Sequence, residues 1–114
     1  MVVPTRGGVV LVRFPFSDLS DSKLRPAVVL ADAERGDWIL CQVTSKAYGD
    51  KRAVELDPVD FAAGSLRTTS FARPAKLFTA NKNLILGQVG TLKFNVMLRI
   101  VDAVIGILRL NRAP

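Results

Sequence analysis

The stretch Ser22–Asp32, "SKLRPAVVLAD", contains the apolar run that decides how this chain folds. Residues 27–31 carry no polar side chain, so a strand there would be buried on both faces. We therefore expect a central strand of a sheet over Arg25–Ala31. Pro26 fits this assignment because a proline at the start of a strand removes no ladder hydrogen bond. Arg25 then stands at a rigid strand edge, where its permanent charge could bind an anion or remain an ordinary surface group.

On either side of this stretch, short apolar segments alternate with glycine, proline and polar turn residues, a pattern typical of a β-rich domain. The further strands expected are Val9–Phe14, Trp38–Thr44, Ala53–Leu56, Thr68–Ala72 closed by Pro74, Ala75–Phe78 as a continuation of the sheet, and Leu84–Val89. We also expect a polar loop over Pro15–Leu24, a turn around Gly36, and a single helical turn over Val59–Ala63.

The segment Leu92–Leu110 predicts an amphipathic helix, with Thr91 as its N-cap. Its polar residues fall at helical spacing in one stripe: Asn95, Arg99, Asp102, Gly106 and Arg109. A membrane span is not expected, because each central charge would cost about 2.5–3.5 kcal/mol in a bilayer. The remaining apolar face is wider than one small sheet can cover, which predicts a self-associating surface and a homodimer.

Together these elements predict a β-rich α+β fold, a small barrel or half-barrel of short, mostly antiparallel strands with a C-terminal α-helix. With 114 residues and 49% apolar residues, the chain is expected to form a single domain over residues 1–114. One cysteine and no recognisable secretory signal favour the cytoplasm. The absence of histidine, together with the single cysteine, predicts no metal site and no cofactor.

Charge is distributed unevenly along the chain. Residues 1–57 hold eight basic and eight acidic residues, whereas residues 58–114 hold eight basic and two acidic ones. A basic surface is typical of proteins that bind a polyanion such as nucleic acid. A merely soluble basic protein would show the same distribution, so charge alone leaves both interpretations open.

The residues with the clearest chemical potential are Arg25, Thr44 and Ser45. If the strands that contain Arg25 and Thr44 pair in antiparallel fashion, the guanidinium and the two hydroxyls meet at one edge of the sheet. Such a cluster could bind a phosphodiester and stabilise a pentacoordinate phosphorane. Alternatively, Arg25 pairs with Asp18 or Asp21, and the two hydroxyls only cap a turn.

Several other residues allow both a functional and a structural interpretation. Ser70, Arg73 and Lys76 combine a hydroxyl with two cations and could hold a neighbouring phosphate, or they could form a solvated strand face. Phe16 and Tyr48 could stack on RNA bases or serve only in packing.

Five motifs in order resemble the MazF/PemK family of toxin endoribonucleases. They are "GGVVLV" at 7–12, "KLRPAVVL" at 23–30, "VTS" at 43–45, Ser70 followed by "KLFT" at 76–79, and "LGQVG" at 86–90 before a helix. The resemblance implies an SH3-like barrel, a homodimer, and a cytoplasmic toxin of a type II toxin–antitoxin module. It also implies metal-independent cleavage of single-stranded RNA at short sequences, with 2′,3′-cyclic phosphate products.

The resemblance places the catalytic arginine at Arg25 and the catalytic threonine at Thr44. Residues expected to contact RNA are Lys23, Ser45, Lys46, Ser70, Arg73, Lys76 and Lys82. A cognate antitoxin is expected to occupy the RNA groove, and DNA binding is expected of the toxin–antitoxin complex. One departure is Gly8, where the family commonly has an acidic residue. Two rival functions are a non-enzymatic toxin of the same fold acting on DNA gyrase, and a catalytically silent RNA-binding barrel.

Overall fold

The computed structural model describes residues 3–15, 22–47 and 49–110 of the chain. Its strands are β1 (Gly8–Pro15), β2 (Ser22–Glu34), β3 (Asp37–Thr44), β4 (Val54–Leu56), β5 (Phe61–Gly64), β6 (Ser70–Asn81) and β7 (Ile85–Leu92). Two short 3₁₀ turns cover Pro58–Asp60 and Lys82–Leu84, and the α-helix α1 covers Phe94–Leu110.

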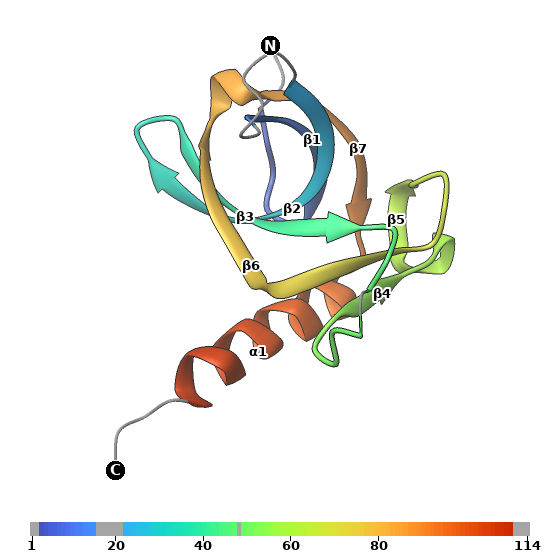
Figure 1. The fold of residues 1–114 in the computed structure, drawn as a ribbon. Coiled ribbons are helices and arrows are strands. Elements are labelled where there is room, and N and C mark those ends of the chain that lie inside the picture. Colours follow the sequence, from blue (N-terminus) through green and yellow to red (C-terminus); the bar gives the residue numbers. More distant parts are fainter. Residues whose placement is uncertain (1–2, 16–21, 48, 111–114) are drawn as a thin grey trace.

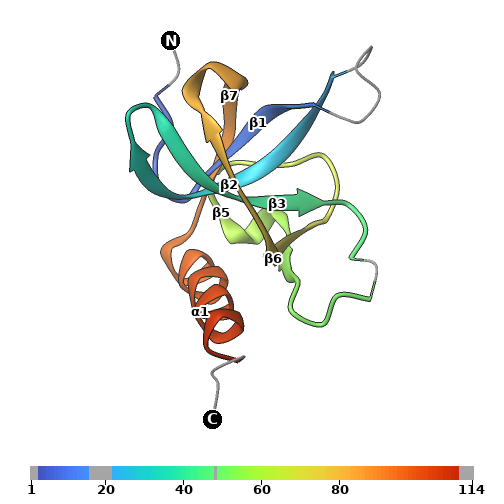
Figure 2. The same ribbon diagram turned by 60° about the vertical axis from the view of Figure 1, so that its left-hand side comes forward.

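The strands form one curled sheet in the order β4-β6-β3-β2-β1-β7-β5, and every pair of neighbours is antiparallel. Figures 1 and 2 show that this sheet curls around on itself and that α1 lies against it. β1 lies between β2 and β7, with Gly8 opposite Thr91. The predicted small barrel of mostly antiparallel strands with one C-terminal helix is therefore confirmed.

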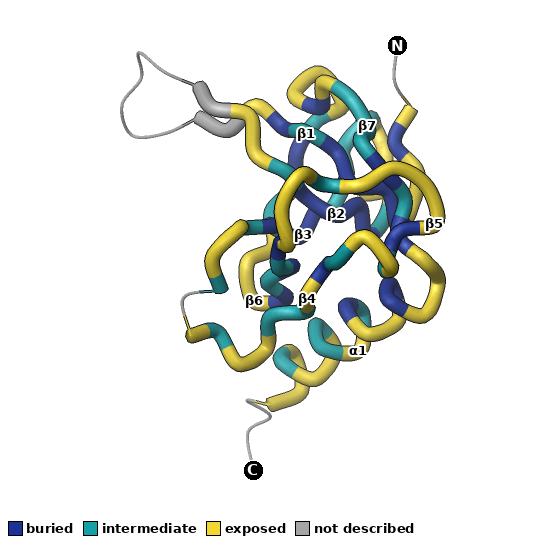
Figure 3. Tube along the Cα trace, turned by 90° about the vertical axis from the view of Figure 1, so that its right-hand side faces the viewer, coloured by how far each residue is buried: buried dark blue, intermediate teal, exposed yellow. Residues whose placement is uncertain are grey.

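The curled sheet buries a different apolar cluster on each of its faces, and Figure 3 shows that much of its central strands is buried. Alternate residues of β2 serve the two sides, because side chains along a strand point to opposite faces. Val28 and Leu30 belong to the cluster beneath α1, with Val96 and Ile100 of the helix. Ala27 and Val29 belong to the second cluster, inside the curl. Burial on both faces is what the apolar run in β2 predicted.

The helix α1 is amphipathic as expected. Its buried residues are Val96, Met97 and Ile100. The five residues of the predicted polar stripe, 95, 99, 102, 106 and 109, are all exposed. Phe94 (75% exposed) and Leu108 (72%) show that much apolar surface of the helix remains uncovered in the single chain. No helix in the described part of the chain is long and apolar enough to cross a membrane.

The prediction of Thr91 as the N-cap of the helix is wrong, because Thr91 belongs to β7. It pairs with Gly8, and its hydroxyl accepts a hydrogen bond from the Gln88 amide at 3.2 Å. The helix starts later, where the carbonyl of Lys93 accepts hydrogen bonds from the amides of Val96 and Met97.

The predicted end of a strand at Pro74 is also wrong, since β6 continues through it. The pairing of β3 with β6 shifts register between Cys41 and Val43, which leaves a bulge around Pro74. A proline without an amide hydrogen is tolerated at such a bulge, and Pro74 is fully buried there. The helical turn expected over Val59–Ala63 is replaced by the 3₁₀ turn Pro58–Asp60, followed by β5.

Candidate functional site

The strand pairing brings Arg25 and Thr44 to the same end of the barrel. The pairing of β2 with β3 ends at Ala27 opposite Gln42. Arg25 and Thr44, the last residue of β3, each lie two residues beyond this last pair. Because side chains two residues apart along a strand share a face, Arg25 lies on the face of Ala27 and Thr44 on the face of Gln42. Arg25 is exposed, and its alternative partners Asp18 and Asp21 lie outside the described residues.

Thr44 also organises the turn that follows it. Its Oγ1 accepts a hydrogen bond from the Lys46 amide at 3.2 Å, which is the turn-stabilising role considered from the sequence. A threonine hydroxyl can donate its proton while it accepts, so this contact leaves Thr44 able to donate to a phosphate oxygen. Ser45 and Lys46 are exposed at the same end of the barrel.

β6 adds further side chains at this end of the barrel. Thr44 is opposite Phe71, and Arg73 follows two residues along β6, at the start of the bulge. Phe71 and Arg73 are both half-buried. β2, β3 and β6 therefore bring Arg25, Thr44, Phe71 and Arg73 to one end of the barrel, which we call the barrel mouth.

Gln42 is a fifth residue of the barrel mouth that sequence reasoning missed. It is half-buried, lies two residues before Thr44 on β3, and so shares its face. Its carboxamide can donate and accept together, which is the chemistry that reads the edge of a nucleobase. The signal was present as a single polar residue inside the otherwise apolar run "WILCQV", residues 38–43.

Other predicted RNA-contacting residues lie elsewhere, and their roles stay predictions. Ser70 is buried and donates a hydrogen bond to the Thr68 carbonyl at 3.0 Å, on the face of β6 opposite to that of Phe71. Lys76 is exposed within the bulge of β6, between Ala72 and Leu77. Lys23 belongs to β2, but its side chain lies outside the described part of the structure.

Lys82 is far from the barrel mouth. β3 pairs with β6 from Asp37 opposite Asn81 to Thr44 opposite Phe71, so Lys82 lies at the other end of β3. At about 3.3 Å per residue, some 23 Å of strand separates the two ends. Lys82 there lines a cavity of about 250 Å³ together with Trp38.

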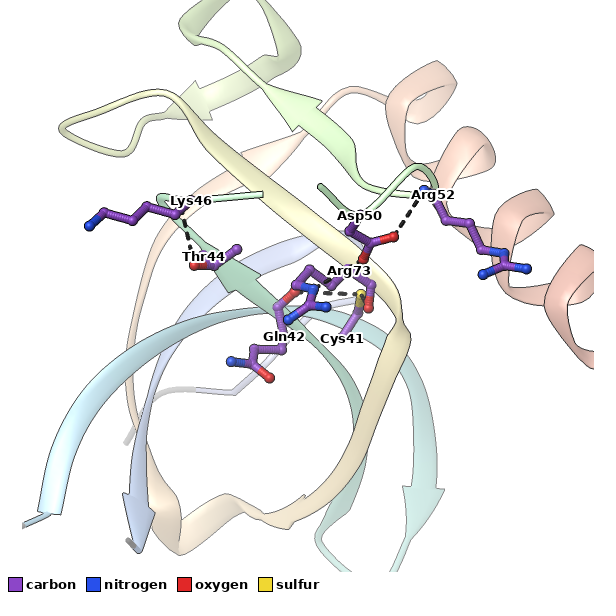
Figure 4. A network of polar contacts seen from close by, with 7 residues as sticks. All are labelled: Cys41, Gln42, Thr44, Lys46, Asp50, Arg52 and Arg73. Carbon is purple, nitrogen blue, oxygen red and sulfur yellow. Dashed lines mark hydrogen bonds and ion pairs between the residues drawn. The ribbon is translucent and has the colours of Figure 1, made fainter. Parts of the chain in front are cut away.

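A polar network joins the loop after Thr44 to β6, as Figure 4 shows. Arg73 Nε donates to Asp50 Oδ2 at 3.0 Å, and the Arg52 amide donates to Asp50 Oδ1 at 2.9 Å. The Arg52 amide, and after it the Arg73 guanidinium, holds the pKa of Asp50 below its ordinary value. Only 10% of the Asp50 side chain and 22% of the Arg73 side chain are exposed. No local sequence pattern indicates this pair, because its partners are 23 residues apart.

Cys41 adds a hydrogen bond to the backbone of Arg73. Its Sγ donates to the Arg73 carbonyl at 3.2 Å. Burial raises the pKa of the Cys41 thiol to about 12, so the thiol stays protonated at neutral pH. A protonated, buried thiol is not a nucleophile, and Cys41 therefore serves to fix the backbone next to Arg73.

Gly8, the departure from the family pattern, is covered by Gln88. A Cβ at position 8 would lie 2.5 Å from Gln88 Oε1. The Gln88 amide is held there by hydrogen bonds to Thr5 and Thr91, both 3.2 Å long. An acidic side chain at position 8 would therefore require Gln88 to move.

Comparison with known proteins gives a consistent result. A family model described as "PemK-like, MazF-like toxin of type II toxin-antitoxin system" matches residues 5–108. No curated protein matches the sequence significantly. A MazE–MazF complex from Deinococcus radiodurans is similar in structure, with a TM-score of 0.76 and 21% identity over 94% of this chain and 97% of that one.

Two mycobacterial structures are similar as well. An endoribonuclease in complex with its cognate antitoxin gives a TM-score of 0.69 and 16% identity, with both chains covered completely. An endoribonuclease from a mycobacterial species gives 0.71 and 19% identity over 99% of this chain and 98% of that one. At these identities the structural likeness concerns the fold. The family model covers most of the sequence, and on that ground the chain belongs to the PemK-like, MazF-like toxins of type II toxin–antitoxin systems.

Proposed function

We propose that this toxin is a metal-independent endoribonuclease that cleaves single-stranded RNA at a short sequence in the cytoplasm. The observation that supports the proposal is the antiparallel pairing of β2 with β3, whose last pair, Ala27 opposite Gln42, lies two residues from both Arg25 and Thr44. A fixed cation and a hydroxyl donor at the same end of a sheet are suited to one phosphodiester group. The similar solved chains that are endoribonucleases lend it further support.

In the proposed reaction, RNA supplies its own nucleophile. The 2′-oxygen attacks the adjacent phosphorus and loses its proton, the P–O2′ bond forms, and the P–O5′ bond breaks. The departing O5′ takes up a proton, which leaves a 2′,3′-cyclic phosphate and a 5′-hydroxyl. Arg25 stabilises the additional negative charge of the phosphorane, and Thr44 donates a hydrogen bond to a non-bridging oxygen. Arg25 is a poor base, because its guanidinium stays protonated.

We further propose that two copies form a homodimer and that a cognate antitoxin covers the RNA groove. The uncovered apolar side chains of α1, such as Phe94 and Leu108, supply surface for association. The basic second half of the chain favours an antitoxin segment that is acidic. The solved MazE–MazF complex shows that a protein of this fold associates with an antitoxin.

The test incubates purified protein with a long single-stranded RNA in EDTA and maps the new 5′ ends. The Arg25→Ala variant should lose cleavage, and Arg109→Ala, which removes an exposed arginine from the polar stripe of α1, should retain it. Cuts at one short sequence by wild type and by Arg109→Ala alone support the proposal. Absence of cleavage refutes the proposal and favours the gyrase-directed toxin or the silent RNA-binding barrel. Equal cleavage by Arg25→Ala refutes the proposed site.

A further inference from the structure

A cavity of about 530 Å³ lies beside the barrel mouth, between the loop after β3 and the bulge of β6. It is lined by Gly49, Asp50, Lys51, Arg52, Arg73 and Ala75. Three of these residues are cations and one is an acid, so the lining carries a formal charge of +2. Lys51 and Arg52 had no role in the sequence-based prediction of the site.

The acid in this cavity is already satisfied by the protein. Both oxygens of Asp50 accept hydrogen bonds, one from the Arg52 amide and one from Arg73 Nε. The Asp50 amide donates to the Ala47 carbonyl at 2.9 Å, which closes the loop further. Asp50 thus fixes the turn that carries Lys51 and Arg52, two of the residues that line the cavity.

The contact through Nε also orients Arg73. A guanidinium has five N–H donors in a plane, and Asp50 engages the Nε side of that plane. The two terminal nitrogens remain as a fork, the geometry that binds phosphate oxygens in a bidentate manner. The Cys41 thiol donates a hydrogen bond to the Arg73 carbonyl and so holds its backbone. The backbone of Arg73 and the Nε of its side chain are therefore both held in place.

The cavity lies within reach of an RNA strand bound at Thr44. Thr44 is opposite Phe71, and Arg73 is two residues further along β6. Two residues along a strand and one spacing between strands give a distance on the order of 8 Å between the Cα atoms of Thr44 and Arg73. A strand whose scissile phosphate contacts Thr44 can therefore place a neighbouring phosphate in the cavity.

We infer that Lys51, Arg52 and Arg73 form a second phosphate-binding subsite for the RNA backbone, which Asp50 holds in its binding geometry. The inference rests on the proposed RNA-cleaving function and deepens it. This subsite binds the phosphodiester backbone and does not read bases, because its cavity is lined by cationic groups around a single neutralised acid. The subsite raises the affinity for RNA and positions the strand, whereas Arg25 and Thr44 act on the scissile phosphate.

The experiment measures binding of an RNA with 2′-O-methyl riboses throughout, which lacks the nucleophile and cannot be cleaved. Dissociation constants are measured by fluorescence anisotropy across a range of salt concentrations. In single strands, each phosphate contact contributes about 0.7 to the slope of log affinity against log salt. The double variant Lys51→Gln/Arg52→Gln should lower the magnitude of this slope by about 1.4. The double variant Lys93→Gln/Arg109→Gln, which removes two exposed charges elsewhere, should keep the wild-type slope.

A second arm follows cleavage of the corresponding natural RNA. The Lys51→Gln/Arg52→Gln variant should raise KM about tenfold or more and leave both kcat and the cleavage sequence unchanged. Equal salt slopes for the two double variants would overturn the subsite. If wild-type protein cleaves no RNA but the slopes differ as expected, the proposed function fails and the phosphate subsite stands. Melting curves of both variants check that they are folded.

Discussion

Replacing Asp50 with asparagine tests the network that ties the loop after β3 to β6. Asparagine keeps the oxygen that accepts the Arg52 amide, but it loses the charge that holds Arg73. The substitution therefore removes the ion pair with little change in shape. Asp102→Asn is the matched control, since it makes the same chemical change on the exposed stripe of α1.

The expected loss follows from the burial of the pair. Hydrogen bonds to charged groups contribute about 1.5–3 kcal/mol. Because 22% of the Arg73 side chain and 10% of the Asp50 side chain remain exposed, we expect a value near the lower end, about 1.5–2 kcal/mol at pH 7. For a chain of this size, about 4 °C of melting temperature corresponds to 1 kcal/mol. The Asp50→Asn variant should thus melt ~6–8 °C below wild type, and Asp102→Asn within ~2 °C of it.

The pH dependence of this difference identifies its cause. The pKa of Asp50 is lower in the folded protein than its ordinary value, which is about 3.9 in an unfolded chain. The carboxylate therefore stabilises the fold fully above about pH 4 and loses this effect as the pH falls through the folded pKa. Urea unfolding from pH 7 down to pH 2 should show the wild type and Asp50→Asn converging. A stability difference that stays constant over this range would refute the ion-pair explanation.

Three further predictions concern Cys41, a pair of glycines and Ile100. Cys41, with its pKa of about 12 and no exposed surface, should react with a thiol reagent at pH 8 only as fast as the protein unfolds, and immediate labelling would contradict its burial. Gly90→Ala should lower the free energy of unfolding by about 1–3 kcal/mol, because its Cβ would lie 2.8 Å from the Phe61 ring. Gly106→Ala should raise it by about 0.5–1 kcal/mol, because a Cβ there lies in open space. Urea titration measures both changes. Ile100→Ala should lose about 2–5 kcal/mol in the same assay, since Ile100 is fully buried under the sheet; a loss below 1 kcal/mol would contradict that packing.

Much of the fold could be predicted from local patterns. The apolar run in β2, the stripe of polar residues on α1 and the turn at Gly36 each obey a periodicity or a turn preference that a few neighbouring residues determine. Gly36 indeed has φ +82°, a conformation for which glycine is suited. Antiparallel pairing of β2 and β3 then follows from the short turn between them, and it brings Arg25 and Thr44 to the same end of the sheet.

Features that depend on distant partners could not be predicted. Pro74 is a strand breaker in sequence, and it is accommodated only because β3 shifts register beside it. Thr91 has the side chain of a helix cap, but its pairing with Gly8 keeps it in a strand. The contact between Asp50 and Arg73, and the position of Lys82 at the far end of β3, depend on how the sheet curls. No local pattern encodes that curvature.

The position of β1 between β2 and β7 has a consequence for the synthesis of the protein. Thr91 follows its partner Gly8 by 83 residues, which a ribosome adds in about 4–17 s. During these seconds the β7-facing edge of β1 has unpaired amides and carbonyls next to apolar side chains, a surface prone to pair with other chains. Arg25 and Thr44 are made early in this interval, before the sheet around them can close. The nascent toxin therefore passes through a period in which β1 has an unpaired edge and the sheet that holds Arg25 and Thr44 is not yet closed.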